Sequence, residues 1–378
     1  MKINFFRPGV ALAAVAATAA GGLTTLTAHA TDVVPFTCPT GAAAVSADGS
    51  SFQNNGVQAA ITAYGSACPG NGAVTYTATG SGTGIADLTA RRVGFAGTDV
   101  PYSDPQWVAL MQGSNTNASL LETIPVALGA VAVVYTAPAG CTVPTGTQLS
   151  GATLSKLYSG QVAANWSAIV PSCNAALTLN VRTNSSGTSK AFKDYLFKKD
   201  PATWANFNNS SPAPAGWPAP AAVTGCGTTN AAMITCAQTA GNISYVDYSD
   251  ANARSMPVFA IDNATGAFAV PATSGVDCTQ AATTGATPPS TLLDWSTVSI
   301  TNGPTGYGDC TYTYQLAFVT PVQAGAAASA AVAANIKGFI AYEVSDAGQG
   351  VYASKNYEKL PPQVQALAQA GAAQLTTN

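Results

Sequence analysis

Histidine is almost absent from this chain of 378 residues, and the only one is His29. It lies in a segment that we expect to be removed, so the remaining protein has no histidine. A Ser-His-Asp triad, a histidine metal site and a histidine general base are therefore excluded. No lysine stands three positions after a serine either, so a Ser-x-x-Lys nucleophile is missing. These absences argue against a conventional hydrolase, and we expect neither a metal nor a cofactor.

Long apolar runs are also lacking. Lys2 and Arg7 give a basic start, Val10 to Ala20 are apolar, and Ala28-His29-Ala30 fits a cleavage site. The apolar part is too short to span a membrane, and no comparable run follows it. We therefore predict a signal peptide at residues 1–30. No cysteine stands at the cut to carry a lipid, so a periplasmic or secreted protein is expected.

Charged residues make up only 8% of the chain, and positive charge is the scarcer sign. Loss of Lys2 and Arg7 leaves 12 basic residues against 17 acidic ones, a net charge of −5. Such a surface disfavours nucleic acid and anionic lipid as partners. An anion site must therefore depend on local N–H donors. The remaining length of about 350 residues exceeds what one core usually covers, which predicts two lobes.

Eight cysteines remain after the cut, and no two of them form a Cys-x-x-Cys pair. An even number in an exported protein indicates four disulfides rather than zinc or redox chemistry. Eight cysteines allow 105 connectivities. Pairing of neighbours keeps each bridge local and is our prediction: Cys38–Cys68, Cys141–Cys173, Cys226–Cys236 and Cys278–Cys310.

The segment Arg182–Ala191 is the strongest candidate for an anion site. It follows an alternating β-prone run at 176–181 and precedes a run at 190–199 whose apolar residues share one helical face. Between them lie short hydroxyl residues and glycine, which suit a helix N-terminus whose free N–H groups face a ligand. Arg182 adds a rigid set of donors that fits a tetrahedral oxyanion. For the Ser-Gly-Thr sequence alone, an ordinary capped helix is the alternative.

The same succession of strand, small-residue turn and helix occurs twice earlier in the chain. Residues 42–45 are expected to form a strand that leads through Ser46–Phe52 into a helix at 53–64. A strand at 73–77 leads through the glycine-rich turn Gly80–Gly84 into a helical segment at 85–92. That turn matches neither a Walker loop nor the Rossmann spacing. Three such turns, each offering N–H groups and hydroxyls, point to one shared site.

Asp99 ends a short apolar run at 93–99. A lone aspartate there is most often a cap or turn residue. Beside an oxyanion, however, a carboxylate repels a fully ionised ligand and accepts a hydrogen bond from a protonated one. This chemistry favours hydrogen phosphate over sulfate, because an unpaired buried polar group is costly.

The rest of the chain alternates between predicted strands and helices, which indicates an α/β protein. Residues 124–135 form the most continuous apolar strand and suit a crossing between lobes, with 311–319 as the return crossing. A strand is also expected at 243–247, with helices at 149–159, 324–338 and 362–375, and an irregular surface excursion at 207–225. Trp166 and Trp204 are expected to pack, and Arg91 and Arg92 to interact with a helix C-terminus.

The order of these motifs resembles the phosphate-binding proteins that serve phosphate ABC transporters. The resemblance covers nearly the whole mature chain and includes Gly49–Phe52, Tyr76–Ile85, Phe95–Asp99, Ile124-Pro125, Arg182–Thr188 and the late Tyr357…Pro361. It implies a two-lobed periplasmic-binding-protein fold of type II, made of two α/β lobes joined by hinge crossings. Lobe 1 is expected at 31–124 plus 318–378, and lobe 2 at 125–317.

The resemblance also implies which residues bind phosphate. Asp99 would accept the phosphate proton, and Phe52 would contribute its backbone N–H. The implied set is Ser51, Phe52, Ser81, Asp99, Arg182, Ser186, Gly187 and Thr188. The family usually has an acidic residue two positions after the arginine, whereas this chain has Asn184, so the arginine loses a charged neighbour.

The leading hypothesis is therefore an exported monomer that captures inorganic phosphate between two lobes, without covalent chemistry, and delivers it to a membrane permease. A different oxyanion such as arsenate is one alternative. A secreted phosphatase-like relative that uses the same pocket is another, with Asp99 or a serine acting on a bound ester. The low charge and the Thr, Asn and Gly content leave a surface or adhesive protein as a third.

Overall fold

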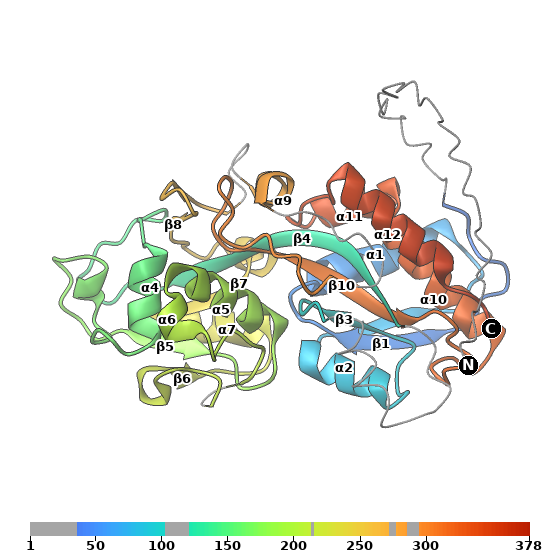
Figure 1. Cartoon of the computed structure of the whole chain (residues 1–378), viewed down its shortest axis with the longest axis horizontal. Helices are drawn as coiled ribbons and strands as arrows, with labels where there is room; N and C mark the ends of the chain where they lie inside the picture. The colour runs from blue at the N-terminus through green and yellow to red at the C-terminus, as the bar shows by residue number, and fades with distance from the viewer. Residues whose placement is uncertain (1–35, 103–120, 213–214, 272–276, 286–294) are drawn as a thin grey trace, which may run out of the picture. The chain divides into compact units, whose positions relative to one another are not determined.

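The computed structural model describes residues 36–102, 121–212, 215–271, 277–285 and 295–378, and the chain from Val34 onward forms one compact unit. The predicted signal peptide at 1–30 lies outside the described residues. Strands and helices alternate as expected (Figure 1). The strands are β1 (Val45–Gly49), β2 (Val74–Thr77), β3 (Phe95–Thr98), β4 (Leu121–Tyr135), β5 (Thr178–Val181), β6 (Thr224–Gly225), β7 (Asn242–Asp247), β8 (Ile261–Asp262), β9 (Phe268–Ala269) and β10 (Cys310–Phe318).

The helices surround these strands (Figure 1). They are α1 (Asn54–Ala67), α2 (Ser81–Thr89), α4 (Gly151–Tyr158), α5 (Gly187–Lys199), α6 (Pro201–Trp204), α7 (Asn230–Ala237), α8 (Tyr248–Ala253), α9 (Cys278–Gly285), α10 (Ala330–Glu343), α11 (Asp346–Ala353) and α12 (Pro362–Gln374). Short 3₁₀ turns lie at Trp166–Ala168 and Pro220–Ala222. Among the described residues, no helix combines the length and the apolar character that a membrane crossing requires.

One sheet of eight strands organises the fold, in the order β2-β1-β3-β10-β4-β7-β5-β6. At one end β1 lies parallel to β2 and β3, and at the other β5 lies parallel to β6 and β7. The long strands β4 and β10 run antiparallel to each other and join the two ends. This is the architecture of two α/β lobes connected by two crossing strands, as the sequence predicted.

The crossing strand β4 is buried along all of its 15 residues. A register shift interrupts its pairing with β10: Thr313 lies opposite Ala127 and Tyr314 opposite Pro125, so Val126 has no partner in the ladder. Proline lacks the N–H that a central strand must donate and is found at bulges. The Val126 carbonyl instead accepts a hydrogen bond of 2.7 Å from Nε2 of Gln349 in α11.

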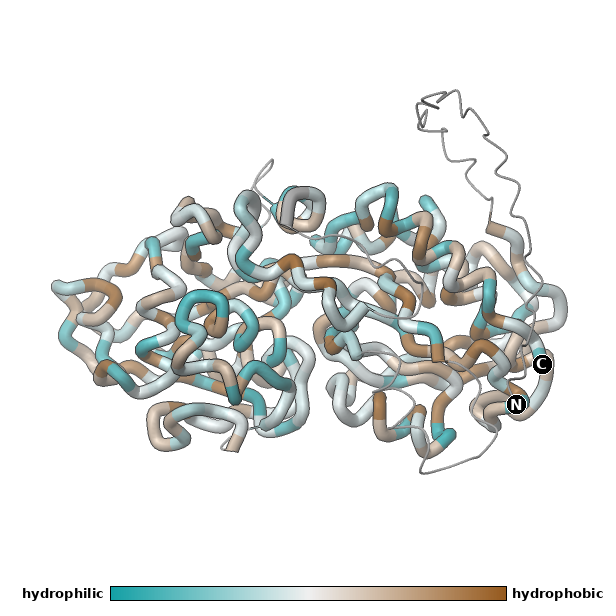
Figure 2. Tube along the Cα trace, viewed as in Figure 1, coloured by the Kyte–Doolittle hydropathy of each residue, from teal (hydrophilic) through white to brown (hydrophobic). Residues whose placement is uncertain are grey.

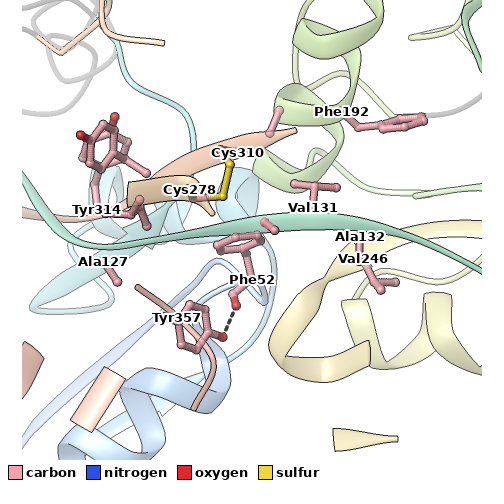
Figure 3. Packing of buried hydrophobic residues seen from close by; sticks show 14 of the residues in the cluster. Phe52, Ala127, Val131, Ala132, Phe192, Val246, Cys278, Cys310, Tyr314 and Tyr357 are labelled. Carbon is pink, nitrogen blue, oxygen red and sulfur yellow. Dashed lines mark hydrogen bonds between the residues drawn. A yellow bond between two sulfur atoms is a disulfide. The ribbon is translucent and has the colours of Figure 1, made fainter. Parts of the chain in front are cut away.

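Apolar residues follow the crossing strands, as Figure 2 shows along β4. Figure 3 shows Phe52 and Tyr357 packing beside Ala127 and Val131 of this strand, with the Cys278–Cys310 disulfide close by. Trp166 and Trp204 are fully buried, which confirms their predicted packing role. The larger core cluster continues along β4 and reaches both ends of the sheet, and a second, smaller cluster includes Leu88 of α2 and Phe318 of β10.

All four disulfides pair neighbouring cysteines, as predicted: Cys38–Cys68, Cys141–Cys173, Cys226–Cys236 and Cys278–Cys310. Arg91 also behaves as predicted, since its guanidinium donates to the carbonyls of Leu88 and Thr89 at the end of α2. Arg92 forms an exposed ion pair with Asp87 instead of bonding the helix end.

Several element boundaries differ from the sequence prediction, and three elements differ by four residues or more at one end. The first strand covers Val45–Gly49 and not 42–45, because the polar residues that follow Val45 enter the sheet between β2 and β3. The helix expected at 85–92 begins at Ser81, inside the glycine-rich turn. The helix expected at 324–338 begins at Ala330, after the cap of Ser329, and continues to Glu343.

Candidate functional site

Three helix N-termini meet at the predicted site. Ser51 lies between β1 and α1, Ser81 opens α2, and Gly187 opens α5. Asp99 directly follows β3, and Arg182 directly follows β5. All five residues are buried. Parallel strands place these turns at a common edge of each lobe, where free helix N–H groups favour an anion.

Asp99 lies at the centre of this arrangement. Its Oδ2 accepts a hydrogen bond of 2.6 Å from Ser50, and its Oδ1 accepts one of 2.7 Å from Thr313. A longer bond of 3.4 Å comes from the hydroxyl of Ser81. The carboxyl is thus fixed by hydroxyls from β10, from the turn before α1 and from the first residue of α2.

Burial raises the pKa of Asp99 to about 6. The hydrogen bonds from Ser50 and Thr313 and the charge of Arg182 oppose this rise, because they stabilise the ionised form. The carboxyl is therefore largely ionised at neutral pH and can accept a hydrogen bond from a protonated ligand. In mildly acidic solution it becomes protonated and loses that capacity.

Arg182 spans the two sides of the site. Its Nη1 donates to the Ser51 hydroxyl at 3.2 Å, its Nη2 donates to the Thr228 carbonyl, and its Nε donates to Oδ1 of Asn184 at 3.1 Å. Burial lowers the pKa of Arg182 to about 10, so the guanidinium stays charged at neutral pH. The site therefore holds one buried positive charge beside one buried carboxyl.

Ser81 and Gly187 bring the second and third helix N-termini into contact. The Gly187 N–H donates to the Ser81 hydroxyl at 3.2 Å. A Cβ on Gly187 would lie 2.6 Å from both Oδ2 of Asp99 and the Ser81 Oγ. Only glycine leaves room for these two groups at the start of α5.

The other predicted residues hold different positions. Ser186 caps α5, because its hydroxyl accepts a hydrogen bond of 3.2 Å from the Ser189 N–H. Thr188 is buried in the first turn of the same helix. The Phe52 N–H, expected to face a ligand, donates to the Ser50 hydroxyl at 3.0 Å in this structure. The Phe52 ring packs against Tyr357 in the core.

Sequence reasoning missed three residues that shape the site. Ser50 and Thr313 both bond Asp99. The Tyr245 hydroxyl accepts from the Arg182 N–H at 3.2 Å and shares a hydrogen bond of 2.6 Å with Ser189. Ser50 could have been found as the neighbour of Ser51, whereas β10 carries no local signal that its threonine meets Asp99.

This arrangement can hold a small tetrahedral anion. Helix N–H groups, hydroxyls and a guanidinium supply donors, and Asp99 supplies one acceptor. Among the residues that the structure describes, no group of three or more His, Cys, Asp or Glu side chains could hold a metal ion. The donor set itself suits recognition of an oxyanion by hydrogen bonds.

Two α/β lobes joined by crossing strands, with helix N-termini converging on an arginine and a carboxyl, define a two-lobed solute-binding fold. The sequence pattern of the PBP superfamily domain matches residues 18–347. The chain therefore belongs to the PBP superfamily.

Curated relatives match a smaller part of the chain. The phosphate-binding protein PstS 3 of Mycobacterium tuberculosis is 29% identical over 165 residues, which is 42% of this chain and 42% of that protein. PstS 2 of the same organism is 26% identical over 163 residues, or 41% of this chain and 42% of that protein. The matched part thus spans less than half the length of these relatives.

Solved structures show the same fold over most of the chain. A high-affinity periplasmic phosphate-binding protein (PfluDING), solved with phosphate, has a TM-score of 0.67 at 19% identity and covers 86% of this chain and 93% of that one. A phosphate-binding protein from Stenotrophomonas maltophilia has a TM-score of 0.63 at 19% identity, over 87% of this chain and 94% of that one. At this identity the likeness concerns the fold alone.

Proposed function

We propose that this protein captures inorganic phosphate between its two lobes. The observation that carries the proposal is the placement of the Asp99 carboxyl, which lies within hydrogen-bond distance of Ser81 and beside the start of α5. Donors for phosphate oxygens and an acceptor for a phosphate proton thus occupy one site. Family membership and the phosphate-binding relatives support the same ligand.

The contacts we propose are those that the sequence resemblance implied. Arg182 and the helix N-termini bind oxygens, and Asp99 accepts the proton of hydrogen phosphate. The full set is Ser51, Phe52, Ser81, Asp99, Arg182, Ser186, Gly187 and Thr188. For Phe52 the proposal requires that its N–H turn from Ser50 to the ligand.

The protonation state of Asp99 gives selectivity between oxyanions. Its pKa of about 6 leaves the carboxyl ionised at neutral pH. Hydrogen phosphate can donate a hydrogen bond to this carboxylate through its proton, whereas sulfate has no proton and cannot donate one. Binding of sulfate would place two negatively charged groups in contact without a hydrogen bond, which is strongly unfavourable.

We also propose the setting in which this protein works. Four disulfides fit an exported protein, in the periplasm or outside the cell. The ligand would be handed to the permease of a phosphate ABC importer without covalent change. Lobe 1 at 31–124 plus 318–378 and lobe 2 at 125–317 would close over phosphate as separate bodies of one monomer.

Calorimetric titration of the phosphate-stripped mature protein with phosphate, arsenate and sulfate at pH 7 tests this proposal. We expect one phosphate bound per chain, competition by arsenate and no heat from sulfate. Arg182→Ala should weaken phosphate binding at least tenfold, because hydrogen bonds to a charged group contribute about 1.5–3 kcal/mol each. Absence of phosphate heat and of any thermal shift would refute phosphate capture. The phosphatase alternative would be indicated if the wild type released product from a chromogenic phosphate ester and Arg182→Ala did not.

A further inference from the structure

Asn184 joins two parts of the site that come from opposite ends of the sheet. Its Oδ1 accepts the hydrogen bond of 3.1 Å from Nε of Arg182, and its Nδ2 donates one of 3.2 Å to the Thr79 carbonyl. Thr79 follows β2, whereas Arg182 follows β5, and these strands lie near opposite ends of the strand order. The side chain therefore bridges the two lobes.

The partners of Asn184 fix the orientation of its amide. A guanidinium can only donate and a carbonyl can only accept, so the oxygen must face Arg182 and the nitrogen must face Thr79. Neither an aspartate nor an aliphatic side chain can make both bonds. The position thus requires a group with one donor and one acceptor.

Gly80 makes room for this bridge. Its φ of 101° is a backbone conformation that side chains rarely adopt. A Cβ at Gly80 would also lie 2.4 Å from Nδ2 of Asn184. The Gly80 N–H donates to the Gly49 carbonyl at 2.6 Å, which holds the loop against β1. The loop that receives Asn184 is therefore built for close approach.

The identity of residue 184 also affects the electrostatic field of Arg182. The side-chain hydrogen bonds of its guanidinium go to the Asn184 amide, the Ser51 hydroxyl and the Thr228 carbonyl, all of which are neutral. A carboxylate at position 184 would form an ion pair with the guanidinium and cancel part of its field. With asparagine there, Arg182 is held in place, and position 184 adds no negative charge to that of Asp99, which already interacts with the guanidinium.

We propose that Asn184 is a closure latch and an affinity-determining residue, which ties the lobes together through Thr79 and places no further negative charge beside Arg182 and a dianionic ligand. This inference rests in part on the proposed phosphate function. The proposal gives Asn184 two roles: it makes a hydrogen bond between the lobes, and it carries no negative charge. A separate variant tests each role.

Asn184→Ala removes the bridge without adding charge. Loss of one such hydrogen bond corresponds to about 2- to 10-fold faster dissociation of phosphate, independent of salt. Asn184→Asp removes the bond to Thr79 and adds a negative charge beside the ligand. Its loss of phosphate affinity should be larger at low ionic strength than at high ionic strength, because salt screens the repulsion. Gln363→Glu is the matched control, since it makes the same change from amide to carboxylate at an exposed position of α12.

Small-angle X-ray scattering of the ligand-free proteins gives a readout that needs no phosphate. Asn184→Ala should increase the radius of gyration, whereas Gln363→Glu should leave it unchanged. If the wild type binds no phosphate, the proposed function fails, and the scattering comparison still decides whether the latch exists. The latch would be overturned if Asn184→Ala had both the radius of gyration and the rate of phosphate dissociation of the wild type. The charge role would be overturned if phosphate binding by Asn184→Asp depended on salt in the same way as binding by the wild type.

Discussion

The hydroxyl of Thr313 donates a hydrogen bond of 2.7 Å to Oδ1 of Asp99, which lies 214 positions earlier in the chain. This bond connects a crossing strand to the group that we propose to sense the phosphate proton. It also lowers the pKa of that group, because it stabilises the ionised carboxylate. The crossing strand therefore takes part in the chemistry of the site.

Replacement of Thr313 by valine should shift the pH dependence of phosphate binding. The variant has nearly the same shape but no donor, so the pKa of Asp99 rises above about 6. We expect phosphate affinity several-fold below wild type at pH 6 to 7 and a recovery by pH 8.5, measured by titration calorimetry. Thr311→Val on the same strand is the control, because its hydroxyl donates to the Tyr312 carbonyl. An unchanged pH profile in Thr313→Val would contradict this role.

Replacement of Asp99 by asparagine should change how stability depends on pH. Burial raises the folded pKa of Asp99 from 3.8 to about 6, so stability from this group is complete below pH 3.8 and is lost as pH rises through 6. In the ligand-free variant that loss disappears. The unfolding free energy of the variant relative to wild type should thus increase by up to about 3 kcal/mol between these pH values. Urea denaturation at several pH values measures this difference in unfolding free energy. A difference that stays constant with pH would contradict the prediction.

A methyl group at Gly187 should weaken phosphate binding strongly. The added Cβ of Gly187→Ala would lie 2.6 Å from Asp99 Oδ2 and from the Ser81 Oγ, so one of these groups must move. We expect at least tenfold weaker binding by calorimetry. Gly65→Ala in α1 is the matched control, because no atom lies within 4 Å of its Cβ and alanine favours a helix. Wild-type affinity in Gly187→Ala would show that the start of α5 does not contact the ligand.

Buried Lys193 should make stability increase in alkaline solution. Burial lowers its pKa from 10.5 to about 7, and its ammonium donates to Asn209 Oδ1 and to the carbonyls of Ser211 and Gly216. Because the unfolded chain binds the proton more tightly, the contribution of Lys193 rises as pH increases from about 7 to 10.5. Lys193→Met should remove this pH dependence in urea denaturation.

The same variant should also weaken phosphate binding by a few-fold. The loop held by Lys193 includes Ser210, whose carbonyl accepts from the Ser186 N–H at 3.1 Å before α5. Lys337→Met, at a partly exposed lysine of α10, serves as the control. Equal pH dependence in Lys193→Met and wild type would contradict the role of the buried ammonium.

Local patterns were sufficient to predict much of this fold. Apolar periodicity indicated α5, β4 and α12, and local pairing gave the four disulfides. Small residues between strand and helix indicated the three turns at which Ser51, Ser81 and Gly187 meet. Each of these turns is a short stretch that joins a strand to the next helix in the chain, so it is visible without the fold.

Other features depend on contacts that local sequence does not show. No pattern around Thr313 predicts its bond to Asp99, because the sheet order alone brings β10 beside β3. Helix α11 was missed because Gly348 and Gly350 weaken the helical signal. A Cβ on Gly348 would lie 2.1 Å from the Tyr342 carbonyl, so tight packing explains that glycine.

The bulge at Val126 has a consequence for the energetics of lobe motion. It interrupts the ladder opposite Thr313 and Tyr314, at the place where a crossing strand can bend most easily. Bending there would move the Thr313 hydroxyl relative to Asp99 and so change how tightly that carboxyl holds its proton. Opening and closing should therefore exchange hydrogen ions with the solvent. Near pH 6 the heat of ligand binding should then vary with the ionisation enthalpy of the buffer, and the Thr313→Val variant should show a smaller variation.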